Sequence, residues 1–263
     1  MELFYREIGE GEPVVILHGL YGSSDNWMSI ARVLSSNYKV ILVDQRNHGR
    51  SPHSMSHSYK DMVDDLKELL EKLELQKVSL MGHSMGGKTA TLLTAQYPER
   101  VNKLIVVDIL PIAMDVNRLE QEHGKILSAL LMLRPELAST RSELDATLAK
   151  HVKSKSVRQF LLKNIKRDKD GAFQWTLNVE AISYNLSHLM GSVFNTESEA
   201  AIDVPTLFIK GEMSDYIPND SPKLLDGMFN NYKISIVPNA GHWLHAENPK
   251  FFLNLIEDFL QTT

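Results

Sequence analysis

Residues 78–86 read Val78-Ser79-Leu80-Met81-Gly82-His83-Ser84-Met85-Gly86, and an Ala- and Leu-rich helical pattern follows them. The first four residues are typical of a buried β-strand. The remaining five place a serine between two glycines where strand and helix meet. The chain turns so sharply at such a junction that side chains at the glycine positions would collide with neighbouring backbone. The pattern predicts a turn that presents the Ser84 hydroxyl as a nucleophile; the alternative is an inert serine in a Gly-rich turn.

Short apolar runs of the same kind recur along the chain, separated by helical patterns. Ser58 and Asp61 predict a capping box before the apolar helical stripe of residues 59–73, and a second stripe follows within residues 251–260. Alternating strands and helices predict an α/β fold with a mostly parallel sheet flanked by helices. The expected strands are Val14–Leu17, Val40–Val43, Val78–Met81, Leu104–Val107, Thr206–Ile209 and Ile234–Val237.

The alternation stops between about Pro111 and Asp203, where no convincing strand is found. Two helical stripes are expected there, one with Leu127, Leu130, Leu131 and Leu133, and one with Val157, Phe160, Leu161 and Ile165. We therefore expect residues 1–110 and 204–263 to form the core and residues 111–203 to form a helical cap. Ligand sites in such sheets lie at the carboxyl ends of the strands, which is where a cap would sit.

Two further loops supply candidate partners for Ser84. His242 follows a glycine just after the last expected strand, and a loop there can bring a general base to the serine. His245 is expected to cap or pack at the start of the final helix instead. In a serine hydrolase the oxyanion is held by the N–H after the nucleophile, here Met85, and by an N–H from the loop after an earlier strand, here Leu20.

The sequence resembles the α/β-hydrolase superfamily over nearly its whole length, and within it the small bacterial esterases of the YbfF type. The resemblance rests on five segments: His18-Gly19, Asp44–Ser51, Gly82–Gly87, Tyr97–Val101 and Gly241–Trp243, with Val107–Ile109 as a further point. It implies an eight-stranded or nearly eight-stranded sheet with a helical cap. Only Leu3–Ile8 precedes Val14, so the first strand of the family pattern is expected to be missing.

The acid that completes a Ser–His–acid triad has two candidates. Many members of the superfamily carry Gly-x-x-Asp after the strand that follows the cap, but this chain reads Gly211-Glu212-Met213-Ser214-Asp215, with serine at the expected position. Asp108 ends the strand after the nucleophile helix, a position that YbfF-type esterases use. We favour Asp108 to orient His242, with Ser214 as an auxiliary hydrogen-bond partner, over Asp215.

These residues predict an acyl-transfer hydrolase that cleaves small-molecule carboxylic esters with a small to medium acyl chain. Thioesters are the next choice. Residues 150–169 are strongly basic, which is typical of a solvated helix face; the alternative is a docking surface for an anionic carrier such as the coenzyme A of an acyl thioester. The alternative to an enzyme is a non-enzymatic small-molecule receptor with the same fold. A haloalkane dehalogenase is disfavoured, since it needs a carboxylate in place of Ser84. The polar residues Asp44, Arg46, His48 and Ser51 are expected to brace backbone near the Ser84 turn.

Composition restricts the remaining choices. The formal charge is −5, with no basic tail, so nucleic acid is not an expected partner. Cysteine is absent, which excludes disulfides and thiolate chemistry. No histidine–carboxylate cluster with metal spacing and no phosphate-binding glycine loop is found, so neither a metal nor a cofactor is expected. No signal peptide or membrane span is found, and a cytoplasmic protein is the simplest expectation. The oligomeric state is left open.

Overall fold

A computed structural model of the chain describes residues 1–113, 116–194 and 200–262. Within them, seven strands form one sheet in the order β1-β3-β2-β4-β5-β8-β9. β1 is antiparallel to β3, and every other neighbouring pair is parallel. The strands are β1 (Tyr5–Ile8), β2 (Glu12–Leu17), β3 (Tyr38–Val43), β4 (Val78–His83), β5 (Val101–Val107), β8 (Thr206–Gly211) and β9 (Tyr232–Val237). The six expected apolar runs are all strands, and the mostly parallel α/β sheet is confirmed.

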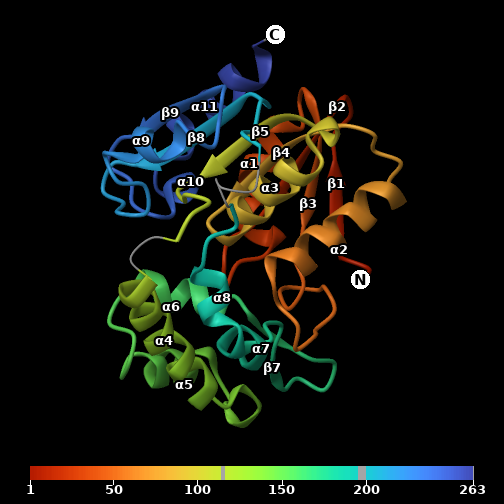
Figure 1. Cartoon of the computed structure of the whole chain (residues 1–263). Coiled ribbons are helices and arrows are strands. Elements are labelled where there is room, and N and C mark those ends of the chain that lie inside the picture. The colour runs from red at the N-terminus through yellow and green to blue at the C-terminus, as the bar shows by residue number, and fades with distance from the viewer. Residues whose placement is uncertain (114–115, 195–199, 263) are drawn as a thin grey trace.

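Helices cover both faces of this sheet (Figure 1). One face packs against residues of α1 (Met28–Leu34) and α11 (Pro249–Gln261), which bury large side chains such as Trp27 and Phe252 nearby. The other face packs against α2 (Tyr59–Lys72) and α3 (Met85–Gln96). Because both faces are buried, the strands consist of nearly continuous apolar residues rather than an alternating pattern. Three short elements complete the core: η1 (Ser24–Trp27), α9 (Ser221–Leu225) and α10 (Leu244–Glu247). The helical turn η2 (Pro98–Arg100) joins α3 to β5.

The start of α2 has the predicted capping box. The Ser58 hydroxyl accepts from the Asp61 backbone N–H at 3.1 Å, and the Asp61 carboxylate accepts from the Ser58 backbone N–H at 3.1 Å. Two backbone N–H groups that lack a partner within the helix are satisfied in this way.

The segment between β5 and β8 forms a separate layer beside the sheet, drawn in green and teal in Figure 1. It contains α4 (Val116–Met132), η3 (Pro135–Leu137), α5 (Arg141–Leu148), α6 (Lys155–Leu162), α7 (Val179–Tyr184) and α8 (Leu186–Met190). The expected cap, residues 111–203, includes residues 114–115 and 195–199, which lie outside the described residues. Its division from the core as a domain stays a prediction.

The expectation that this segment has no strand is wrong. Ile165–Arg167 (β6) and Phe173–Trp175 (β7) form an antiparallel hairpin in which Ile165 pairs with Trp175. Three-residue strands are too short for an alternating pattern, so the sequence carries no periodic signal for them. Gly171, with φ of +87°, provides the left-handed residue that reverses the chain between them.

Both predicted helical stripes of the cap are therefore only partly right. α6 ends at Leu162, so Ile165 belongs to the hairpin and not to the stripe of Val157, Phe160 and Leu161. In α4, Leu127 and Leu130 are buried, whereas Leu131 is 41% exposed and Leu133 follows the helix end. Within the described parts of the chain, no helix is both long and apolar enough to cross a membrane.

Candidate active site

Ser84 occupies the turn between β4 and α3. Its backbone has φ of 51° and ψ of −118°, a region that costs a non-glycine residue on the order of 1–3 kcal/mol. The neighbouring glycines allow this turn. A Cβ at Gly82 would overlap the carbonyl oxygen of Gly86, and a Cβ at Gly86 would lie 2.6 Å from the His18 carbonyl oxygen. The strained turn therefore presents the half-buried Ser84 side chain above the carboxyl ends of the strands.

His242 and Asp108 come together at the same edge of the sheet. The imidazole Nδ1 of His242 donates to Asp108 Oδ2 at 2.8 Å, and the carboxylate is fully buried while the imidazole is 20% exposed. Tyr216 stacks on the His242 ring, with ring centroids 3.9 Å apart. Because Nδ1 is used by the carboxylate, Nε2 is the nitrogen available to the cavity that His242 and Ser84 both line.

Asp108 is held firmly in this orientation. It ends β5 with φ of 51°, and its Oδ1 accepts from the Gly211 backbone N–H at 3.0 Å. Its Oδ2 also accepts from the Ser214 hydroxyl. Asp215, the alternative acid, is exposed. The structure thus brings Asp108 to His242, holds Asp108 with the Ser214 hydroxyl, and leaves Asp215 exposed.

His83 supports the His242 loop, which the sequence analysis did not anticipate. Its Nε2–H donates to the backbone carbonyl of His242 at 2.8 Å, and the two rings lie 4.6 Å apart. Burial holds the pKa of His83 well below its ordinary value, with the neighbouring His242 and His245 adding to the effect. A neutral His83 can therefore donate from Nε2 without bringing a second positive charge next to His242. His245 is buried and stacks on Trp27 at 4.2 Å, so it packs as expected, in α10 just before the last helix.

Leu20, in the loop after β2, and Met85, the first residue of α3, line the same cavity as Ser84. In the described part of the chain, the N–H groups of Tyr21 and Gly22 are bonded to His48 Nε2 and the Gly19 carbonyl. No acceptor is found there for the N–H groups of Leu20 and Met85. Leu20 and Ser84 line both cavities described below, and Met85 lines the smaller one. Both N–H groups are therefore candidates to bind an oxyanion at Ser84.

The loop of Asp44, Arg46, His48 and Ser51 braces backbone, as predicted. Asp44 accepts from the Ser24 N–H at 2.6 Å and from the Arg50 N–H at 2.9 Å. His48 donates from Nδ1 to the Arg46 carbonyl, so its Nε2 can accept from the Tyr21 N–H. Burial keeps the pKa of His48 well below its ordinary value, which preserves this acceptor. The loop therefore positions the segment that contains Leu20.

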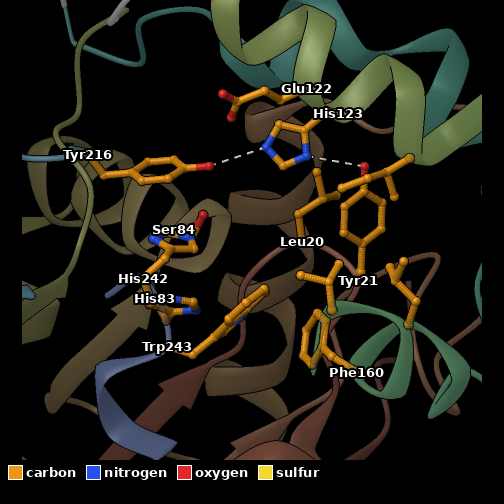
Figure 2. A pocket seen from close by; sticks show the side chains of 13 residues that line it. Leu20, Tyr21, His83, Ser84, Glu122, His123, Phe160, Tyr216, His242 and Trp243 are labelled. Carbon is orange, nitrogen blue, oxygen red and sulfur yellow. Dashed lines mark hydrogen bonds between the residues drawn. The ribbon is translucent and has the colours of Figure 1, made fainter. Parts of the chain in front are cut away.

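Two cavities meet at Ser84, and Figure 2 shows the larger of them. The larger has a volume of about 230 Å³ and the smaller about 20 Å³. Leu20, Ser84, His123 and Tyr216 line both, whereas His242 lines only the larger one. The other walls of the larger cavity are mostly apolar and come from the cap and the His242 loop: Ile126, Val157, Phe160, Leu161 and Trp243.

His123 enters the site from cap helix α4 and bridges two tyrosines (Figure 2). Its Nδ1 lies 3.2 Å from the Tyr21 hydroxyl and its Nε2 lies 3.4 Å from the Tyr216 hydroxyl. Burial lowers the pKa of His123 to about 4, and the charge of His242 contributes. A neutral imidazole accepts from one hydroxyl and donates to the other. No motif marks His123, because its partners come from loops far away in the sequence.

Lys88 is a second site residue that the sequence analysis missed. It lies one helical turn after Ser84 in α3, lines the smaller cavity and is only 4% exposed. Its ammonium donates to the Gly191 carbonyl at 2.6 Å, and burial lowers its pKa to about 8. The described residues contain no group of three or more histidines and carboxylates arranged to hold a metal ion.

Comparisons with known proteins identify the family of the chain. A family model described as the alpha/beta hydrolase fold matches residues 12–249. The sn-1-specific diacylglycerol lipase ABHD11 of Danio rerio is 38% identical, with 96% of this chain and 80% of that protein covered. Esterase YbfF of Escherichia coli is 36% identical, with 94% and 92% covered. A solved structure of a marine microorganism esterase superposes with a TM-score of 0.94 at 45% identity, covering 98% of this chain and 99% of that one.

The family match spans most of the chain, and relatives that carry esterase and lipase names match it over nearly its full length. Together with the strand–serine–helix turn on a mostly parallel sheet, these matches place the chain without ambiguity. It belongs to the α/β hydrolase fold family, and it is an enzyme of the esterase and lipase type within that family.

Proposed function

We propose that the protein hydrolyses small-molecule carboxylic esters through an acyl-enzyme on Ser84. In this mechanism His242 is the general base, Asp108 orients His242, and the N–H groups of Leu20 and Met85 bind the oxyanion. The observation that carries the proposal is the bond from His242 Nδ1 to the buried Asp108 carboxylate, at the edge of a cavity that Ser84 also lines.

The proposed reaction has two balanced halves. Ser84 Oγ attacks the ester carbonyl as His242 Nε2 takes its proton, and the carbonyl oxygen becomes an oxyanion facing Leu20 and Met85. When the C–O bond to the alcohol breaks, His242 returns the proton to the leaving oxygen. Water then attacks the acyl-enzyme with the same help from His242, which releases the acid and restores Ser84. Asp108 stays ionised and stabilises the imidazolium at each step.

The residues that line the larger cavity indicate which class of substrate fits the site. The apolar lining from α4, α6 and the His242 loop favours an ester with little charge, and a small to medium acyl chain is the first choice. The names of the relatives, an esterase and a diacylglycerol lipase, point in the same direction.

A fluorophosphonate probe tests the nucleophile. We expect the probe to label the folded protein once and the label to be lost in Ser84→Ala, whereas Ser187→Ala, which changes an exposed cap serine, keeps it. Both variants should also be assayed with p-nitrophenyl acetate. Labelling and turnover that persist in Ser84→Ala would disprove the assignment. A folded protein with neither labelling nor turnover would instead support the receptor hypothesis.

An acyl-coenzyme A thioester is the second candidate, and one feature favours it. A basic depression on α4 and the following segment contains Lys125, Lys150 and His151, and its other lining residues are Gln121, Gly124 and Ser128. It lies on the side of α4 next to Glu122 and Ile126, which line the larger cavity. Phosphates bound there would bring a thioester near Ser84.

Matched thioesters test this candidate. Acetyl-coenzyme A and S-acetyl-N-acetylcysteamine have the same reacting group, but only the first carries phosphates. If the depression binds phosphate, Lys125→Glu with Lys150→Glu should raise KM for acetyl-coenzyme A at least about fivefold and leave the short thioester unchanged. Equal effects on both substrates, or none on either, would exclude a role for the depression.

A further inference from the structure

The two cavities at Ser84 are chemically different, and only one of them contacts the proposed general acid. His242 lines the larger cavity and not the smaller one. Met85 lines the smaller cavity and not the larger one. An ester bound at Ser84 has an acyl chain and an alcohol that extend in different directions from the reacting carbon. The distribution of His242 and Met85 therefore indicates which cavity receives which part.

The alcohol must lie in the larger cavity, because its oxygen has to be within hydrogen-bond reach of His242 Nε2 when the bond breaks. The carbonyl oxygen faces the N–H groups of Leu20 and Met85. The acyl chain is then left with the smaller cavity, which extends from Met85 along α3 towards Lys88. This argument rests on the proposed roles of Ser84 and His242.

The smaller cavity admits very little. Its volume of about 20 Å³ is close to the space of one water molecule, for which about 10–15 Å³ is needed. Buried side chains of the cap close it, namely Leu119 from α4 and Leu189 and Met190 from α8. Tyr59 stands beside them and donates its hydroxyl to the Leu189 carbonyl at 2.8 Å, which holds α8 in place.

Lys88 also opposes a long alkyl chain. Its buried ammonium donates to the backbone carbonyls of Gly191 and Met190, and among the described residues these carbonyls are its hydrogen-bond partners. An alkyl chain pushed to this end would remove further polar surroundings from a buried charge, which is costly. In contrast, the larger cavity offers Phe160, Leu161 and Trp243 to an apolar group.

We infer that the smaller cavity is the acyl subsite and the larger one the alcohol subsite, so the protein prefers esters of a short acyl group with a long or bulky apolar alcohol. Leu119 sets the acyl limit. The specificity is thus directional: the same number of carbons is accepted on the alcohol side and rejected on the acyl side.

Two isomeric esters test this preference. Hexyl acetate and ethyl hexanoate have the same composition and similar hydrophobicity, but the long chain is on the alcohol in the first and on the acid in the second. We expect kcat/KM for hexyl acetate to be at least about tenfold higher, since each methylene that does not fit is worth a factor of about 10 or more. Released acid is measured by titration at constant pH.

Matched truncations in α4 assign the preference to one cavity. Leu119 lines only the smaller cavity and Ile126 only the larger one. Leu119→Ala should raise kcat/KM for ethyl hexanoate itself by at least about fivefold, whereas Ile126→Ala should not raise it. Should Leu119→Ala fold poorly, Met190→Ala opens the same cavity from α8.

The outcomes separate this inference from the proposed function. If Ser84→Ala keeps full turnover of both esters, the proposed function fails. If Ser84→Ala abolishes turnover but the wild-type protein cleaves ethyl hexanoate as well as hexyl acetate, the function stands and the subsite assignment is overturned. A gain in kcat/KM for ethyl hexanoate that appears in Ile126→Ala and not in Leu119→Ala would also overturn the assignment.

Discussion

At the scale of single residues, the two carboxylate oxygens of Asp108 accept hydrogen bonds from different donors. Oδ1 accepts from the Gly211 N–H, while Oδ2 accepts from His242 and from the Ser214 hydroxyl. A carboxylate anchored by backbone and hydroxyl donors cannot rotate away from the imidazole. Ser214 lies in the loop after β8, so its hydroxyl helps to hold a carboxylate that comes from a different strand, β5.

Asp108→Asn should lower kcat for p-nitrophenyl acetate by about 10³–10⁴-fold, because an amide at this position favours the wrong tautomer of His242. Asp215→Asn is the matched control and should retain nearly full activity, since Asp215 is exposed. Steady-state rates of both variants give the comparison, with far-UV circular dichroism as a check on folding. The opposite result, with Asp215→Asn inactive and Asp108→Asn active, would make Asp215 the acid.

Sequence reasoning proposed Ser84, Asp108 and His242 because each lies at or shortly after the carboxyl end of a strand that the apolar pattern identifies. Lys88 and His123 were missed for a different reason. Both lie within helices and carry no motif, and their partners, Gly191 for Lys88 and two tyrosines for His123, are distant in sequence. Only the packing of the cap against the core makes these residues part of the site.

At the scale of elements, α4 is attached to the core by the hydrogen bonds of one side chain. His123 contacts the hydroxyl of Tyr21, from the loop after β2, and that of Tyr216, from the loop after β8. These loops also contain Leu20 and Ser214. The position of the cap helix is therefore linked to the loops that shape the site.

His123→Phe should lower the free energy of unfolding by about 2 kcal/mol, because two hydrogen bonds are lost and the Tyr21 hydroxyl stays buried without a partner. It should also raise KM several-fold as α4 loses its fixed position. Urea unfolding followed by tryptophan fluorescence measures the first effect. His188→Phe replaces an exposed cap histidine and should change neither quantity. Unaltered stability and KM in His123→Phe would show that the bridge does not hold the cap.

At the scale of the whole molecule, burial of histidines links stability to pH. Burial lowers the pKa of His245 and of His57 to about 3 and that of His123 to about 4, from an ordinary value of 6.5. At a pH between the lowered pKa of the folded state and the ordinary pKa of the unfolded state, the unfolded chain binds more protons than the folded chain. Stability therefore falls as the pH decreases below about 6.5, by about 1.4 kcal/mol per pH unit for each such histidine.

His245→Phe should flatten this dependence. Phenylalanine can keep the stacking on Trp27, it removes a buried Nδ1 that has no partner in the described part of the chain, and it cannot take up a proton on unfolding. The loss of unfolding free energy between pH 7 and pH 5 should shrink by about 2 kcal/mol, as measured by urea titration at both values. His151→Phe, at an exposed position, should leave the pH dependence as in the wild type. If the dependence of the unfolding free energy on pH is unchanged in His245→Phe, His245 is not held in its neutral form by burial.

The sequence by itself determined the alternating strands and helices of the core, the strained serine turn and the loops that carry His242 and Asp108. Those features depend on local causes: apolar runs that must be buried, glycines that a tight turn requires, and polar residues at strand ends. The tertiary structure alone decided that Asp108 rather than Asp215 reaches His242, that a short hairpin lies within the cap, and that Ser84 opens onto two cavities of unequal size. Distances between side chains and the volume between layers arise from packing of segments far apart in the chain, and no local pattern encodes them.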